Sequence, residues 1–224
     1  MNHLNAKEER QRMLARFTAV ERRLIASLRT PFAVQRWLRT QAYNREPSGE
    51  TLRGFRGVAR HHTAHCLEAA LFSATVLEQH GYPPTLLSFE SKDGLDHVLH
   101  VVRAGKTRGR FGAVARSRDE GLHGRRMVFR GPRELGYSYW DPYVDLTGRL
   151  TGYALVDLRE LGNYDWRLGE GNLWKVERFL LDYPHRPLRG SNARYRRLYR
   201  RYRAWHELHP DRSPDYHRRT ESWL

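Results

Sequence analysis

The chain has 224 residues, a hydrophobic content of 39% and a formal net charge of +15. This length suits one domain with helical additions, and the apolar content supplies a single core. One cysteine excludes an internal disulfide and any zinc site built on paired cysteines. No apolar run approaches the ~18 residues of a membrane-spanning helix, and the polar N-terminus lacks a signal-peptide apolar region, so we expect a cytoplasmic location.

The positive charge is concentrated towards the two ends of the chain. Residues 1–60 and 185–219 each carry a net charge of +8, whereas residues 61–184 carry none. We therefore predict N-terminal helices and a loop (1–60), a core (61–184) and an Arg/Tyr-rich C-terminal helix and tail (185–224), forming one compact domain. Basic flanks either bind an anionic partner, such as nucleic acid, acidic lipid or an acidic protein, or are solvated helix faces.

The first 60 residues are predicted to form helices and a connection. Apolar residues recur every three to four positions over 6–29, which indicates one amphipathic helix ending at Thr30-Pro31. Residues 32–38 predict a second short helix. Residues 39–60 are polar and predict a connection that either crosses a cleft beside Cys66 or is a plain surface loop.

A largely buried helix is predicted from Cys66 to His80. Its residues are good helix formers with apolar positions three and four apart, and the breaker Gly81-Tyr82-Pro83-Pro84 follows. Cys66 lies in the first turn, with Thr63 as the predicted N-cap. Free N–H groups and the positive end of the helix dipole favour a thiolate there and can hold an oxyanion. The alternative interpretation of Cys66 is a buried structural thiol.

Three histidines directly precede this cysteine. By residue type alone, a metal could be bound by His61, His62, His65 and Cys66. However, adjacent His61 and His62 point apart, and no pair of histidines at helical spacing supports such a site. We expect no metal, and no nucleotide cofactor because no Gly-rich phosphate loop follows a strand. The histidines are expected to line a cleft, with one near the oxyanion position.

Three strands are predicted after the cysteine helix, over residues 85–90, 96–102 and 111–115. Alternation along the second strand places its two histidines, His97 and His100, on opposite faces. A cysteine at a helix start is thus followed by a strand, a histidine strand and a third strand.

This order resembles the transglutaminase-like branch of the papain-like cysteine-nucleophile superfamily, in which the histidine strand has the pattern His-x-x-x-Val, here His97 to Val101. The resemblance covers roughly residues 60–150 and is closest to a group of bacterial transglutaminase-like proteins. It implies Cys66 as the nucleophile, His97 as its base and an orienting Asp near the end of the third strand. Ser117 stands at that position and Asp119 follows it, so both are candidates for the third member.

The segment after the third strand offers further candidate site residues. Residues 117–126 predict a loop in which Arg125 either reaches towards a substrate carboxylate or phosphate or is simply exposed. Residues 127–130 predict a further short strand. Residues 137–145 are dense in aromatics and predict either a segment packed in the core or a wall of the cleft. Asp141 and Asp145, in this segment, are alternative candidates for the missing acid.

The last third of the chain predicts a strand and two helices. The strand covers residues 148–157. The first helix, 172–181, has Asn172 as its cap and places Trp174 and Leu181 on its core face. The second, 191–209, has an aromatic stripe that either packs on the core or binds single-stranded nucleic acid, and residues 210–224 follow as a tail.

These elements together predict an α+β fold, in which the cysteine helix packs on an antiparallel sheet of four to five strands and helices are added at both ends. Two functions are compatible with it. One is a cysteine hydrolase or acyltransferase that attacks an amide or peptide bond through Cys66 and His97. The other is a catalytically inactive transglutaminase-like fold that binds an anionic partner, either nucleic acid or an acidic protein.

Overall fold

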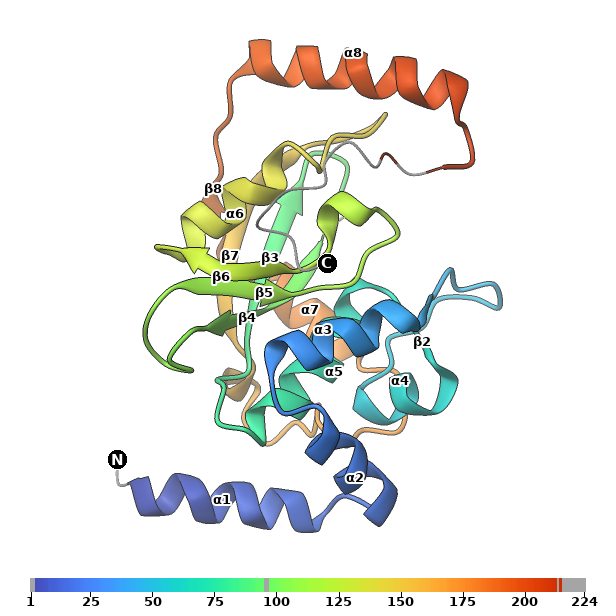
Figure 1. The fold of residues 1–224 in the computed structure, drawn as a ribbon. Coiled ribbons are helices and arrows are strands. Elements are labelled where there is room, and N and C mark those ends of the chain that lie inside the picture. Colours follow the sequence, from blue (N-terminus) through green and yellow to red (C-terminus); the bar gives the residue numbers. More distant parts are fainter. Residues whose placement is uncertain (1–2, 95–96, 213, 215–224) are drawn as a thin grey trace.

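The computed structural model describes residues 3–94, 97–212 and 214. It is a mixed α+β structure built on one six-stranded antiparallel sheet, with strand order β6-β5-β4-β3-β7-β8 (Figure 1). The strands are β3 (Thr85–Ser91), β4 (Val98–Arg103), β5 (Phe111–Val114), β6 (Arg125–Phe129), β7 (Leu150–Asp157) and β8 (Arg186–Pro187). Residue 96, predicted to open the second strand, lies outside the described residues, as does most of the predicted tail.

The sheet has more strands than the four to five predicted. The additional strand is β8, which pairs with β7 through only two residues and contains Pro187. Proline donates no ladder hydrogen bond and is tolerated at a sheet edge. A two-residue edge strand of this kind has no periodicity that the sequence could show.

The described part of the chain also contains eight α-helices, two 3₁₀ helices and a short parallel pair of strands. The helices are α1 (His3–Ala15), α2 (Ala19–Ser27), α3 (Pro31–Thr40), α4 (Phe55–His61), α5 (Cys66–Glu78), α6 (Pro132–Trp140), α7 (Trp174–Leu181), α8 (Asn192–Leu208), η1 (Glu120–Leu122) and η2 (Leu158–Leu161). The parallel pair is β1 (Ala42–Tyr43) with β2 (Thr63–Ala64).

Two predictions for the first 60 residues are wrong. The single helix over 6–29 is two helices, because Thr18 caps a new one: its hydroxyl accepts from the Glu21 N–H, and the Glu21 carboxylate accepts from the Thr18 N–H. The connection over 39–60 contains β1 and α4, so its irregular part is shorter than predicted.

The two faces of the sheet are covered by different helices. On one face, α5 packs on Leu86 and Val98, within apolar clusters that also include residues of α3, α4 and α7. On the other face, α6 packs on Leu87 and Leu99. All residues of α5 from 67 to 77 are buried, which confirms the predicted core helix. Figure 1 shows α1 and α8 at opposite ends of the molecule.

The C-terminal helices depart from prediction in their contacts. Asn172 does not cap α7; Leu173 takes that position, and the Asn172 side chain accepts from the Leu52 N–H. Trp174 and Leu181 are 39% and 62% exposed, so they are not on the core face. Helix α8 has no buried residue, although Tyr195 and Leu198 pack against the apolar cluster to which α6 contributes.

Among the residues that the structure describes, no helix is both long enough and apolar enough to cross a membrane.

Candidate active site

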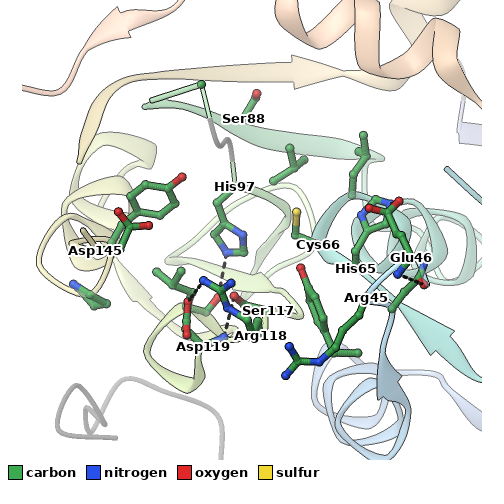
Figure 2. Close-up of a pocket in the computed structure, with 18 of the residues that line it drawn as sticks. Arg45, Glu46, His65, Cys66, Ser88, His97, Ser117, Arg118, Asp119 and Asp145 are labelled. Atoms are coloured by element: carbon green, nitrogen blue, oxygen red, sulfur yellow. Dashed lines mark hydrogen bonds and ion pairs between the residues drawn. The ribbon is translucent and has the colours of Figure 1, made fainter. Parts of the chain in front are cut away.

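Cys66 is the first residue of α5 and is half-buried at a cleft of about 760 Å³ (Figure 2). The N-cap is His65 rather than the predicted Thr63, which lies in β2. Pairing of β2 with β1 brings the chain to the helix start in extended form, and the Glu68 carboxylate accepts from the His65 N–H at 3.1 Å. The thiol therefore lies beside the unpaired N–H groups of the first helical turn.

His97 directly precedes β4 and stands beside Cys66 (Figure 2). Its Nε2–H donates to the carbonyl of Leu122 at 2.9 Å, which leaves Nδ1 for the thiol. The ring is buried and packs against Phe89 and Tyr139, with centroid distances of 6.3 and 5.8 Å. The predicted Cys66–His97 pair is thus brought together, with the imidazole held in one orientation by stacking and by one hydrogen bond.

A second imidazole, that of His65, also contacts the thiol. Its Nε2–H donates to the Thr51 carbonyl at 2.9 Å, and the carboxylates of Glu46 and Glu68 lie 4.0 and 3.9 Å from the same nitrogen. Burial acts to lower the pKa of His65, but the hydrogen bond and charge of Cys66, together with Glu68, raise this pKa to about 9. His65 is therefore a cation at neutral pH.

The thiol of Cys66 is strongly acidic in this setting. Burial acts to raise its pKa, but hydrogen bonds from His65 and His97 and their charges lower the pKa to about 5. A thiol whose pKa lies this far below the usual ~8.5 is a thiolate at neutral pH. The surroundings of Cys66 therefore favour the thiolate form over the neutral thiol.

Two candidates for the third member, Ser117 and Asp119, line the cleft, but their described hydrogen bonds do not reach His97. Ser117 accepts from the Asp119 N–H at 3.1 Å, and Asp119 pairs with Arg118 at 3.4 Å. Asp141 forms an ion pair with Arg194. His97 is oriented instead by the hydrogen bond that its Nε2–H donates to the main-chain carbonyl of Leu122.

Asp145 lines the cleft opposite Cys66 (Figure 2), but its Oδ1 is engaged in a turn. It accepts from the N–H groups of Thr147 and Gly148, both at 2.8 Å. This is the ordinary role of an aspartate in a turn.

Arg125 fixes the turn that carries the Leu122 carbonyl. Its guanidinium is fully buried and donates to the carbonyls of Gly121 and His123, both at 2.6 Å, on either side of Leu122. It also stacks on the Tyr139 ring, 4.1 Å from the centroid. Both predictions for Arg125 are wrong: the side chain is neither exposed nor directed at a substrate, because backbone carbonyls take its donors.

The remaining histidines are dispersed. His61 is exposed at the end of α4, His62 bonds to Gln41 at 3.0 Å, and His100 is buried between Ser73 and the Pro83 carbonyl. Within residues 3–94 and 97–212, no group of three or more His, Cys, Asp or Glu side chains is arranged to hold a metal.

Sequence reasoning missed Tyr43 and Glu68 at this site. Tyr43 lines the cleft, and its pKa is raised by burial and by the charge of Cys66. Glu68 anchors the start of α5, and its position three residues after the N-cap is the spacing of a capping box, a signal present in the sequence. The Leu122 carbonyl left no signal, because a backbone acceptor is independent of residue type.

Neither a scan against protein family models nor a search of curated proteins found a match for this chain. Function is therefore inferred from the geometry of the cleft.

Proposed function

We propose that this protein is a transglutaminase-like cysteine hydrolase or acyltransferase, which attacks an amide or peptide bond through Cys66. One observation carries the proposal: a thiol with a pKa near 5 is hydrogen-bonded by two imidazoles at a helix N-terminus that opens into a cleft. Burial alone would raise the pKa of a structural thiol, so the low pKa of Cys66 is due to the two imidazoles.

The first half of the reaction follows from the geometry. The Cys66 thiolate adds to the amide carbonyl carbon, and the negative charge that develops on oxygen is placed near the N–H groups of the first turn of α5. His97 has taken the thiol proton of Cys66; as the C–N bond breaks, it passes this proton to the leaving amine, and a thioester remains on Cys66. His65 stays charged and stabilises the thiolate before attack and after release.

The second half regenerates the thiolate. His97 takes a proton from water or from an acceptor amine, which attacks the thioester carbon, and the C–S bond breaks. Water gives a hydrolase and an amine gives an acyltransferase. Leu122 holds the ring of His97 through both halves; as a neutral acceptor it orients imidazolium but stabilises its charge less than an aspartate does.

The test is the pH dependence of Cys66 alkylation by iodoacetamide. In the wild type we expect half-maximal reactivity near pH 5, as the pKa of Cys66 requires. His97→Ala removes one hydrogen bond and one charge from the thiolate, so the midpoint moves up towards ~8.5 and the rate at pH 6 falls at least about tenfold. Amide and peptide substrates are then screened with the wild type.

His61→Ala is the matched control, because His61 is exposed and outside the cleft; its profile is expected to equal that of the wild type. If Cys66 reacts only when the protein is unfolded, the enzyme proposal is wrong. The second candidate function, binding of an anionic partner, then takes precedence. It is supported by α8, which has no buried residue and carries six arginines against one glutamate.

A further inference from the structure

Helix α7 presents a continuous stripe of side chains to the cleft. Trp174, Glu177 and Leu181 are spaced three and four residues apart, and all three line the cleft together with Cys66. Trp174 and Leu181 are 39% and 62% exposed, although they are large apolar residues. The core contacts of α7 are made instead by Val176 and Leu180, so the exposed stripe is not a by-product of packing.

The loop over residues 44–53 extends this wall. It is joined to the start of α7 by two hydrogen bonds: the Leu173 N–H donates to the Leu52 carbonyl at 2.8 Å, and the Leu52 N–H donates to the Asn172 side chain at 2.9 Å. The loop contributes Glu46 and Glu50 to the lining of the cleft. One side of the cleft therefore combines an aromatic and aliphatic surface with carboxylates.

The charge of the cleft lining is opposite to that of the whole protein. Five carboxylates and two guanidinium groups line the cleft of a chain whose net charge is +15. These side chains are those of Glu46, Glu50, Asp119, Asp145, Glu177, Arg45 and Arg118.

Most of these carboxylates are engaged within the protein. Asp119 is paired with Arg118, while Glu46 and Asp145 accept from neighbouring loop groups. Glu50 and Glu177 form no hydrogen bond or ion pair with any other residue that the structure describes. These two carboxylates remain to interact with a bound molecule.

We propose that the α7 wall is a subsite for a long basic side chain, that of lysine or arginine, on the peptide whose amide Cys66 attacks. Trp174 and Leu181 contact the methylene groups of this side chain, and Glu177 pairs with its charged end. A lysine or arginine side chain matches this surface because its stem is apolar and its end is cationic. A cation beside the indole ring of Trp174 is stabilised further. The subsite rests on the proposed function, since it positions the substrate of Cys66.

The experiment compares three reagents that alkylate Cys66. Acetyl-lysyl chloromethyl ketone and acetyl-norleucyl chloromethyl ketone differ chiefly in the terminal ammonium group, and iodoacetamide carries no side chain. With each chloromethyl ketone the thiolate forms a C–S bond, and chloride leaves with the C–Cl electron pair. The second-order rate constants are measured at pH 7 for the wild type, Glu177→Gln, Trp174→Ala and Glu8→Gln, an exposed glutamate of α1 outside the cleft.

In the wild type we expect the lysyl reagent to react about tenfold faster than the norleucyl reagent, as one charge-assisted hydrogen bond predicts. Glu177→Gln should remove most of this preference, and Trp174→Ala should slow both chloromethyl ketones together. Glu8→Gln should change nothing. The iodoacetamide rate constant of each protein serves as the reference for its thiol reactivity, so the lysyl and norleucyl rate constants are compared after division by it.

The two proposals fail in different ways. If iodoacetamide does not react with the folded wild type, the nucleophile is absent and both proposals are wrong. If iodoacetamide reacts but the lysyl and norleucyl reagents are equally fast, the nucleophile stands and the basic subsite is wrong. A lysyl preference that Glu177→Gln leaves intact also overturns the assignment to α7.

Discussion

Arg125 determines the geometry of the site without facing the cleft. It holds the carbonyls on either side of Leu122, and Leu122 in turn orients His97. Tyr139 completes this arrangement, because its ring stacks on the guanidinium and its hydroxyl donates to the His123 carbonyl at 3.1 Å. A planar guanidinium can span two carbonyls and stack at the same time, which an ammonium group cannot do.

Arg125→Lys is therefore expected to loosen the turn over residues 120–122. With His97 less firmly oriented, we expect the pH midpoint of Cys66 alkylation to rise and the rate at pH 6 to fall about tenfold. The free energy of unfolding should decrease by about 1–3 kcal/mol, because buried carbonyls lose their donors. Alkylation profiles and urea denaturation measure the two effects.

Arg126→Lys is the control, since Arg126 is the exposed neighbour on the same strand. Loss of stability in Arg125→Lys with an unchanged alkylation midpoint would show that Arg125 only supports the fold and does not position His97.

The sequence predicts that Cys66 and His97 form a pair, but not which group orients His97. Cys66 at a helix start and His97 before an alternating strand are patterns of side chains, and side chains are what a sequence specifies. Ser117 and Asp119 are candidates for the third member because they lie near the end of the third predicted strand, where the resemblance implies an aspartate. The Leu122 carbonyl takes that place through the path of the backbone, which depends on the buried contacts of Arg125.

At the scale of elements, Glu68 connects the irregular loop over 44–53 to the first turn of α5. Its buried carboxylate accepts from Arg53 Nε and Nη2 at 2.7 and 2.9 Å, from Asn44 at 3.0 Å and from the His65 N–H at 3.1 Å. Burial acts to raise the pKa of Glu68, but Arg53 and His65 lower it overall, so this carboxylate is ionised at neutral pH. One residue thus anchors both the start of α5 and a loop that lines the cleft.

Glu68→Gln is expected to destabilise the protein by about 3–5 kcal/mol, because it leaves the charge of Arg53 without its buried partner. The control is Glu207→Gln in α8, where both partners of the ion pair with Arg203 are exposed and a cost of about 1 kcal/mol or less is expected. Urea denaturation at pH 7 measures both. Equal costs for the two variants would contradict the anchoring role of Glu68.

Element boundaries were predictable where the sequence carries a local signal. The cysteine helix and the alternation around His97 and His100 are confirmed, because burial imposes clear periods on long segments. The break at Thr18 also has a signal, the capping box with Glu21. The exposed face of α7 could not be predicted, since apolar residues at a helical spacing ordinarily face a core and here Trp174 and Leu181 line a cleft.

At the scale of the whole molecule, buried histidines make stability depend on pH. Burial lowers the pKa of His100 to about 4, and burial together with Arg116 lowers the pKa of His123 to about 4. In the unfolded chain these two histidines are protonated near pH 6.5, whereas in the native state they stay neutral down to about pH 4. The stability that they contribute is complete above pH 6.5 and is lost as the pH falls towards 4.

We expect the free energy of unfolding to decrease between pH 6.5 and 5 with a slope of up to about 1.4 kcal/mol per pH unit for each of the two histidines. His100→Gln should reduce the slope by one histidine's share, whatever its effect on stability at pH 7. Urea denaturation at several pH values measures the slope, with the exposed His61→Gln as control. An unchanged slope in His100→Gln would contradict the assignment.

The order of strands in the sheet has a consequence for how the protein folds. Strands β3 to β6 are neighbours in both the sequence and the sheet, so their pairing closes short loops. Strand β7 pairs with β3 over a much longer sequence separation, for example Leu150 with Ser91. Short-range pairing is kinetically favoured over long-range pairing. We therefore expect Cys66 and His97 to meet early, in a partly folded chain. Helix α7 follows β7 in sequence and is expected to dock late, so the Cys66–His97 pair should form before the proposed subsite on α7.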